Sequence, residues 1–496
     1  MSLSPTRHAP FGGFECPAGD IGGNGTAPTP LPGMAKATRD LNEGPIWRAL
    51  AVVSAPMTIG ILAVLSVGLV DAYFLGRLGE SELAAVGFVY PVTTAITSLS
   101  IGLSAGANAA LSQAIGRRDD ESAVNRTGLQ AIGLGTLLAV LTALAFWMLD
   151  GPIFRLLGAE GDALRAVLEY TPVWAISFPF LVAMMVGNAV FRAHGKSGLA
   201  ASTMVLAAVV NVALDPVLIF GWGPIPALGM EGAAWATVAG RVASLIAVAV
   251  LLFRQELLSL CAEPMRDLRR SLVEVGAVGA PAALSNAINP AGMALVTAAV
   301  ATLGETAVAG FGAATRIQAI AIVPLLALSS GIGPVVGQAW GAGMRERAQG
   351  AVGLTFALCA GYGIAVGAVL FFFAEPLAGF VATEGAATER AAQYLRVVGW
   401  SLAGYGILVT GNAAMNARSK AVWSMALGLA RVFAVYLPLA WAGVSLFGYA
   451  GVLGAAVAAN LAAIAGVLYA TGRTGLLTFG GGPGAATATP RAEPAE

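Results

Sequence analysis

Two aspartates lie within long runs of apolar residues, where an ionisable side chain is costly and by default marks an ion or substrate pathway. They are Asp71 and Asp215. Asn211 precedes Asp215 by four residues, so the two side chains share a face if this segment is helical. Pro216 has no N–H, and the carbonyl of Val212 therefore loses its usual helical partner. A carboxylate, an amide and a free carbonyl within one turn are hard oxygen ligands, which suit a small hard cation or a proton.

A duplication in the chain helps to interpret these acids. Residues 56–116 align with residues 281–341 at a constant offset of 225, with about twice as many identities as this composition gives by chance. The first copy carries Asp71, and the second copy carries Val296 at the matching position. A structural alternative is that a neighbouring arginine, with Arg241 as the candidate, neutralises each acid. Because only the first half carries acids at this depth, we favour a functional role for them.

The composition places the duplication in a membrane. Hydrophobic residues make up 57% of the chain and charged residues only 11%, against about 25% in soluble domains. Twelve apolar runs are long enough to cross a bilayer as helices. We predict an all-α integral membrane protein with twelve transmembrane helices in two six-helix repeats, related by a pseudo-twofold axis along the membrane normal. The predicted spans are 49–75, 83–111, 127–149, 166–192, 198–221, 229–253, 274–302, 307–338, 350–373, 391–416, 421–446 and 449–472.

Lysine and arginine in the short loops predict the orientation. Most of them lie on one side of the predicted bundle, which we assign to the cytoplasm, and an even number of spans then places both termini there. The loop residues on this side are Arg117, Arg118, Arg126, Arg192, Lys196, Arg254, Arg266, Arg269, Arg270, Arg345, Arg347, Arg418 and Lys420. The other side has only Arg77, Arg155, Arg165 and Arg390.

The ends of the chain are rich in Gly, Pro and polar residues and are predicted to be disordered. The predicted organisation is a cytoplasmic tail (1–45), an N-lobe (46–253), a cytoplasmic linker (254–272), a C-lobe (273–475) and a second cytoplasmic tail (476–496). The three cysteines, Cys16, Cys261 and Cys359, show no pairing pattern, so no disulfide is predicted. The zero net charge gives no indication of a nucleic-acid partner.

An enzymatic alternative rests on residues 102–106, Gly-Leu-Ser-Ala-Gly, which fit the G-x-S-x-G pattern of serine hydrolases. That pattern requires a strand-turn-helix context and a histidine base. Here it lies inside a predicted span, and the only histidines are His8 and His194. Small residues that allow helices to pack closely explain the stretch better. The sequence also has no metal-spaced Cys/His set and no phosphate-binding loop, so we predict neither an enzyme nor a cofactor.

The chain resembles the MATE (multidrug and toxic compound extrusion) transporters, and most closely the branch named for the DinF proteins. The resemblance covers about residues 46–475. It is carried by four motifs in order: Pro56…Val70-Asp71, Asn211-Val-Ala-Leu-Asp215-Pro216, Gly232-Ala-Ala-Trp-Ala-Thr237 and Arg431-Val-Phe-Ala-Val-Tyr-Leu-Pro438-Leu-Ala440.

The resemblance implies two lobes around a central cavity that opens alternately to each side. It also implies a cation site for H⁺ or Na⁺ in the N-lobe. The residues that match this site are Asp71, Asn211, Asp215 and Thr237, and Tyr170 matches a tyrosine that borders the cavity. Tyr170 also fits an interfacial aromatic, because Tyr394 occupies the corresponding place in the second repeat.

The chain departs from other branches of the family at one informative position. Those branches carry a Glu in the seventh helix, eight residues after a proline, and the same count from Pro281 reaches Asn289 here. We therefore place ion coupling in the N-lobe. Pro56, fifteen residues before Asp71, leaves the carbonyl of Val52 without its helical partner and is a candidate conformational switch, although a static kink is an equal alternative.

Together these features predict a secondary antiporter that exports organic compounds, which we expect to be cationic and amphipathic, in exchange for H⁺ or Na⁺. We expect a monomer in the bacterial cytoplasmic membrane, with small organic molecules and the lipid bilayer as its partners. The alternative is a flippase for a lipid-linked sugar, from the wider superfamily, with a basic cavity to which Arg316 and Arg431 could contribute. A channel is a weaker third possibility, because it does not need acids in only one of two repeats.

The orientation can be tested by labelling introduced cysteines in intact cells. A cysteine in the N-terminal tail should be protected from a membrane-impermeant reagent, and a cysteine in the loop 222–228 should be labelled from outside. Labelling of the tail with a silent loop would reverse the assignment.

Overall fold

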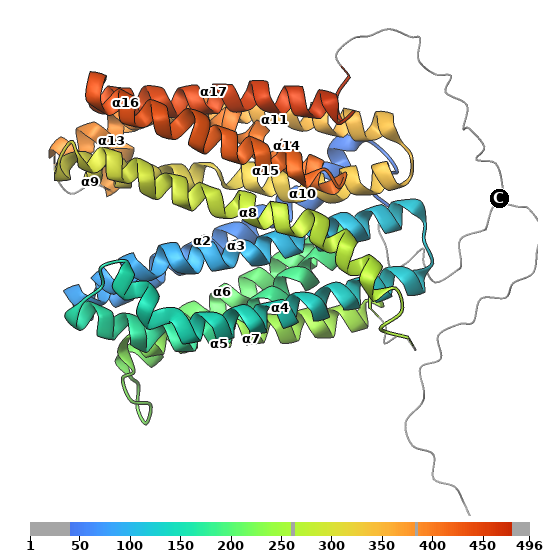
Figure 1. Ribbon diagram of the computed structural model, residues 1–496, viewed down its shortest axis with the longest axis horizontal. Coiled ribbons are helices and arrows are strands. Elements are labelled where there is room, and N and C mark those ends of the chain that lie inside the picture. Colours follow the sequence, from blue (N-terminus) through green and yellow to red (C-terminus); the bar gives the residue numbers. More distant parts are fainter. Residues whose placement is uncertain (1–39, 259–262, 382–384, 479–496) are drawn as a thin grey trace, which may run out of the picture.

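The computed structural model describes residues 40–258, 263–381 and 385–478, and these residues are almost entirely helical (Figure 1). The N-terminal half contains α2 (Ile46–Leu75), α3 (Glu80–Arg117), α4 (Glu121–Leu156), α5 (Gly161–Ala193), α6 (Ser197–Phe220) and α7 (Gly229–Arg254). The C-terminal half contains α8 (Leu268–Ala301), α9 (Glu305–Ala321), α10 (Val323–Gly341), α11 (Arg345–Phe372), α12 (Ala374–Val381), α13 (Gly385–Val398), η1 (Gly399–Ser401), α14 (Leu402–Ala417), α15 (Ala421–Leu429), η2 (Ala430–Tyr436), α16 (Leu437–Phe447) and α17 (Tyr449–Arg473).

The number of membrane crossings agrees with the sequence. In the described residues, 11 helices are long and apolar enough to span a bilayer. The segment from α13 to α14 is interrupted by a 3₁₀ turn at Gly399–Ser401, and it adds the twelfth crossing. The prediction of an all-α membrane protein with six helices per repeat is therefore confirmed.

The two halves differ in the regularity of their helices. The six spans of the N-lobe (α2–α7) are continuous, whereas three spans of the C-lobe (α8–α17) are interrupted. The eighth span breaks at Ile322, just before Pro324; the tenth contains the turn η1; and the eleventh contains the π-helix η2, just before Pro438. Proline has no N–H to give to the preceding turn, which accounts for two of these breaks.

The lobes pack against each other through repeat-related helices. In Figure 1 most of the C-lobe lies above α2, α3 and α8, and α4 to α7 lie below them. α3 packs along α8 of the opposite lobe, and α10 packs in the equivalent way along α2. Both ends of the described chain lie at the same end of the bundle, as an even number of crossings requires (Figure 1). We call this the basic end, because it carries the Lys/Arg-rich loops.

The repeat is visible in individual hydrogen bonds. Ser104 donates to the carbonyl of Met185 at 2.9 Å, and its counterpart Ser329 donates to the carbonyl of Val409 at 3.0 Å. Ser104 also accepts a hydrogen bond from Arg192 at 2.8 Å. The serine of the G-x-S-x-G stretch therefore lies in the interior of α3, bound to α5, and not on a strand-to-helix turn.

A symmetric pair of hydrogen bonds joins the lobes at the basic end. The Gln113 amide of α3 donates to the carbonyl of Ala417 at 2.6 Å, and the Gln338 amide of α10 donates to the carbonyl of Ala193 at 2.7 Å. Next to each glutamine, Gly116 and Gly341 press against the backbone of the opposite lobe, so a Cβ atom at either position would clash. The lobes are therefore in backbone contact at this end.

The packed part of the chain begins slightly before the first span. The Leu41 N–H donates to the Gln338 side chain at 3.0 Å, and the Leu41 side chain is buried. Arg347 donates to the carbonyls of Leu41 and Gly44 at 2.8 and 2.9 Å. The last residues of the predicted N-terminal tail are thus held against the C-lobe. Residues 1–39 and 479–496 of the tails, with Cys16, lie outside the described residues, and so does Cys261 of the predicted linker.

The inter-lobe bonds at the basic end predict a measurable shift in conformation. The double change Gln113→Ala and Gln338→Ala should increase the population in which the lobes separate at this end, because each change removes at least one hydrogen bond between the lobes, worth about 1 kcal/mol net. Spin labels at Asp120 and Met344, in a background without native cysteines, would report longer distances. Gln349→Ala is the matched control, since Gln349 donates to the carbonyl of Gly475 within the C-lobe at 3.0 Å. An unchanged distance distribution in the double variant would contradict the expectation.

Candidate functional site

The predicted site residues come from four helices of the N-lobe. Asp71 is near the last turn of α2 and Asp215 is near the last turn of α6, and these two helices run in the same direction and pack together. Their acids therefore lie at similar depth, toward the end opposite the basic end. Thr237 of α7 and Tyr170 of α5 lie about two turns from the start of antiparallel helices, which brings them to the same level.

The close approach of α6 and α7 follows from glycine. A Cβ atom added at Gly240 would lie 2.6 Å from the carbonyl oxygen of Ala207 and 3.3 Å from Cβ of Asn211. Gly232, two turns earlier on α7, faces the backbone of Leu218 in the same way. Without side chains at these positions the two helices can meet backbone to backbone, which places Asn211 next to Thr237.

The structure brings the two acids together. The carboxyl groups of Asp71 and Asp215 lie against each other, and Asp215 has no exposed surface. Among the described residues, no N–H or O–H group donates to either oxygen of Asp215 or to Oδ1 of Asp71, and all three atoms are buried. Two facing sets of acceptor oxygens repel each other unless a proton or a cation lies between them.

Asn211 and Thr237 extend this cluster of oxygens. Asn211 Nδ2 donates to Thr237 Oγ1 at 3.4 Å, and the hydroxyl of Thr237 is also bound to the carbonyl of Ala233 at 3.1 Å. Oδ1 of Asn211 is buried and receives no hydrogen bond from the described residues. The side chain of Tyr170 interacts with Thr237, so it borders the group. Four free oxygens from two acids and one amide are thus available to a monovalent cation or a shared proton.

Arg241 does not take the role of a direct partner for the acids. Its guanidinium donates to Ser177 Oγ and lies over the ring of Trp174, with Cζ 5.3 Å from the ring centroid. In the described part of the chain, no ion pair within 4.0 Å joins it to Asp71 or Asp215. Its charge still acts on Asp71 through space. A salt bridge to Arg241, which was the structural alternative for the role of the two acids, is therefore not formed.

The described part of the second repeat has no equivalent of the acid pair. Val296, at the position of Asp71, is completely buried. Asn289 lies on α8 and is half-buried. The described residues contain no group of three His, Cys, Asp or Glu side chains that could hold a metal ion.

Comparison with known proteins gives the family. The family model described as MatE matches residues 56–217 and 281–442, so it covers each repeat once and both copies begin and end at corresponding positions. The chain belongs to the MATE family. Members of this family are transporters, so this MATE protein is a transporter and not a serine hydrolase.

This MATE protein is similar to two relatives in sequence and to one solved structure in fold. It is 34% identical over 427 residues to the FAD transporter of Shewanella oneidensis, covering 86% of this chain and 94% of that protein. It is 25% identical over 413 residues to the probable multidrug resistance protein YoeA of Bacillus subtilis, covering 82% and 88%. The crystal structure of the Vibrio cholerae MATE transporter VcmN in the bent form matches with a TM-score of 0.81 at 28% identity, covering 86% of this chain and 96% of that one.

The predicted switch residue lies on the same helix as Asp71. Pro56 is inside α2, which runs without interruption from Ile46 to Leu75. A groove of about 960 Å³, lined by Trp47, Arg48, Pro56 and Lys196 among others, lies beside this part of the helix. A helix that lacks one hydrogen bond and borders open space can bend there at low cost.

We expect Pro56→Ala to favour a straight α2, to reduce transport several-fold and to leave substrate binding largely intact. Pro281→Ala is the matched control, because Pro281 occupies the same place in α8 with no acid after it. Transport and binding would be measured on both purified variants. Equal losses in both, or no loss in Pro56→Ala, would show that the proline only shapes the lobe.

Proposed function

We propose that this MATE protein is a secondary antiporter of the DinF-like branch, which exports an organic compound in exchange for H⁺ or Na⁺ bound in the N-lobe. The observation that carries the proposal is the contact between Asp71 and Asp215, buried and with three oxygens free of donors. A static structural role would leave this arrangement costly, because buried carboxylates without partners destabilise a fold. A coupling ion that comes and goes makes the same arrangement useful.

The site can work with either ion. Burial disfavours the charged form of a carboxylate, so the acid pair can hold a proton between its oxygens. Na⁺ would use the same carboxylate oxygens and the free oxygen of Asn211. One inward charge at about 100 mV supplies roughly 2.3 kcal/mol, which supports about a 50-fold substrate gradient. We assign the acids to the external half of the membrane and the contacts of Gln113 and Gln338 to the cytoplasmic seal.

The substrate has two candidate classes. The acids of the N-lobe favour an organic cation, which could exchange with the coupling ion at the same carboxylates, and a multidrug-resistance relative is consistent with that class. The relative at 34% identity is a FAD transporter, which favours an anionic flavin nucleotide. The flippase alternative needs a basic cavity, and the acid pair argues against it as the main activity.

The acid pair gives a direct test of coupling. Asp71→Asn and Asp215→Asn should each abolish ion-driven efflux, because either change removes the second carboxylate from the pair. Asn211→Ala and Thr237→Ala should weaken efflux by about tenfold or less, since each removes one neutral ligand. Efflux would be measured in proteoliposomes with an imposed pH gradient, and separately with an imposed Na⁺ gradient, to identify the ion.

Asn289→Ala is the control for the choice of lobe. Since the described residues of the C-lobe contain no acid pair, this change should leave coupled efflux close to that of the unmodified protein. Loss of efflux in Asn289→Ala together with normal efflux in Asp71→Asn would show that ion coupling lies in the C-lobe, and our assignment to the N-lobe would be wrong.

A further inference from the structure

The C-lobe contains a buried cationic cluster that the proposed ion site does not use. Its centre is Arg431 on η2. Nη2 of Arg431 donates to Oδ1 of Asn460 at 2.8 Å, and Nδ2 of Asn460 donates to Ser401 Oγ at 2.8 Å. The guanidinium also lies over Tyr405, with Cζ 5.7 Å from the ring centroid. These contacts orient the guanidinium, but none of them neutralises its charge.

No acid balances Arg431. Within the described residues, no carboxylate lies within 4.0 Å of it, and its Nε is buried without an acceptor. An isolated buried cation with an unused donor is costly, and the cost is relieved when an anion binds. Arg431 is only half-buried as a residue, so a ligand can reach it.

The backbone around the cluster is irregular in a way that points to a ligand. Ser401 lies in the 3₁₀ turn of the tenth span, and Tyr394 lies about one helical turn before it. Arg431 lies in the π-helix of the eleventh span. Gln318, which accepts a hydrogen bond from the Tyr394 hydroxyl at 2.6 Å, lies one turn before the break in the eighth span. Irregular backbone at membrane depth is tolerated where it is enclosed by protein or lines a cavity, and π-helical turns are frequent at functional sites.

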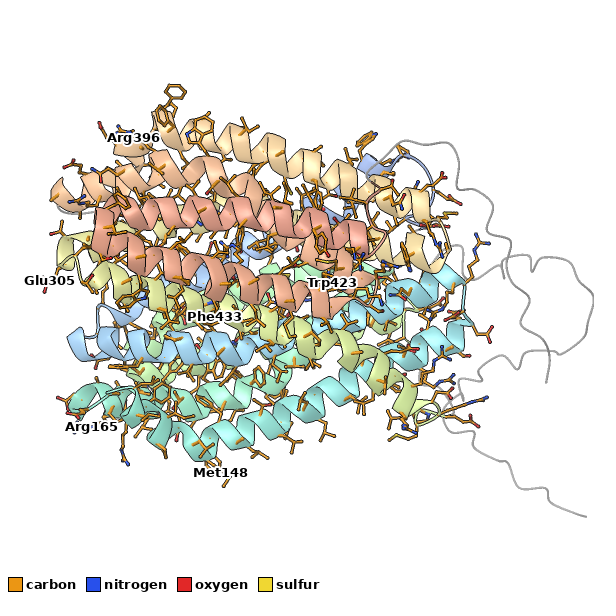
Figure 2. All side chains as sticks on the ribbon, turned by 45° about the horizontal axis from the view of Figure 1, so that its top comes forward. Met148, Arg165, Glu305, Arg396, Trp423 and Phe433 are labelled. Carbon is orange, nitrogen blue, oxygen red and sulfur yellow. The ribbon has the colours of Figure 1, made fainter. Side chains whose placement is uncertain are left out.

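The cluster lies deep in the membrane. Figure 2 labels Phe433, two residues after Arg431, near the middle of the bundle, and Trp423 on the same span lies nearer the basic end. Arg431 is therefore not an interfacial arginine that reaches lipid headgroups. At this depth the N-lobe carries paired acids with Arg241 nearby, whereas Arg431 of the C-lobe has no acid beside it among the described residues.

We propose that the Arg431 cluster binds the anionic group of the transported substrate, and that this substrate is a soluble aromatic phosphate of the flavin-nucleotide type. The inference rests on the proposed function as an exporter and names its substrate class. A guanidinium can bind two phosphate oxygens at once through its planar fork, and it has an unused donor here. The surrounding tyrosines offer hydroxyl donors for the phosphate and apolar ring faces for an aromatic ring.

The experiment measures equilibrium binding of FAD, FMN and riboflavin to the purified protein in nanodiscs, by the change in flavin fluorescence. The three probes share one ring system and differ in phosphate. The unmodified protein should bind FAD and FMN more tightly than riboflavin. Arg431→Gln should weaken FAD binding by about 10- to 100-fold, the range for a lost charged hydrogen bond, and should leave riboflavin binding unchanged. Arg431→Lys should recover part of the loss, which excludes a folding defect.

Arg192→Gln is the control for removing a buried arginine, because Arg192 binds Ser104 in the N-lobe. It should not alter the preference for phosphate. Equal affinity of the unmodified protein for FAD and riboflavin, or unchanged FAD affinity in Arg431→Gln, would overturn the inference. Displacement of FAD by a polyprenyl pyrophosphate at much lower concentration than by inorganic pyrophosphate would also overturn it, in favour of a lipid-linked substrate.

The outcome is separable from that of the ion site. Asp71→Asn and Asp215→Asn should retain FAD binding while losing gradient-driven transport of FAD. If these variants transport normally, the antiport proposal fails and the Arg431 result stands on its own. If Arg431→Gln binds FAD normally while the aspartate variants lose coupled efflux, the substrate class is wrong and the antiporter remains.

Discussion

A lipid bilayer offers no hydrogen-bond partners, and this constraint governs the whole structure. Every backbone N–H and C=O in the apolar region must find a partner within the protein, so the chain crosses as helices. The same constraint makes each charge at depth conspicuous. Asp71, Asp215, Arg241 and Arg431 all lie on helices that pack inside a lobe, and only Arg241 combines a hydroxyl partner with an aromatic face and a nearby opposite charge. The acids and Arg431 keep atoms that have no partner among the residues that the structure describes.

Gene duplication supplied two similar lobes, and their differences carry the function we propose. The matched contacts of Ser104 and Ser329, and of Gln113 and Gln338, show that the scaffold has been retained in both copies. The charges have not been retained. Two diverged copies of one lobe can supply separate sites for an ion and for a larger substrate without a new fold.

In the proposed mechanism, the interface between the lobes would couple these two sites. Gly116 and Gly341 bring opposing backbones into contact at the basic end, while the acids of the N-lobe lie near the other end. A rigid lobe that rotates about such an interface opens one end as it closes the other. Ligands in the two lobes can then shift the same equilibrium, provided that each binds one of the two arrangements more tightly.

The amino-acid sequence by itself determined the class of protein, the number of spans, the duplication and the positions of Asp71 and Asp215. These features are local or periodic: an apolar run of about 20 residues must be a helix in a bilayer, whatever its neighbours are. The sequence also placed Asn211 beside Asp215, because a four-residue spacing fixes one helix face.

Only the tertiary structure decided that Asp71 of α2 meets Asp215 of α6, that Arg241 turns to Ser177 and Trp174, and that Arg431 is held by Asn460 without an acid. Each of these contacts joins residues of different helices. Which side chains meet depends on how glycines such as Gly240 let the helices approach, and no spacing along one helix contains that information.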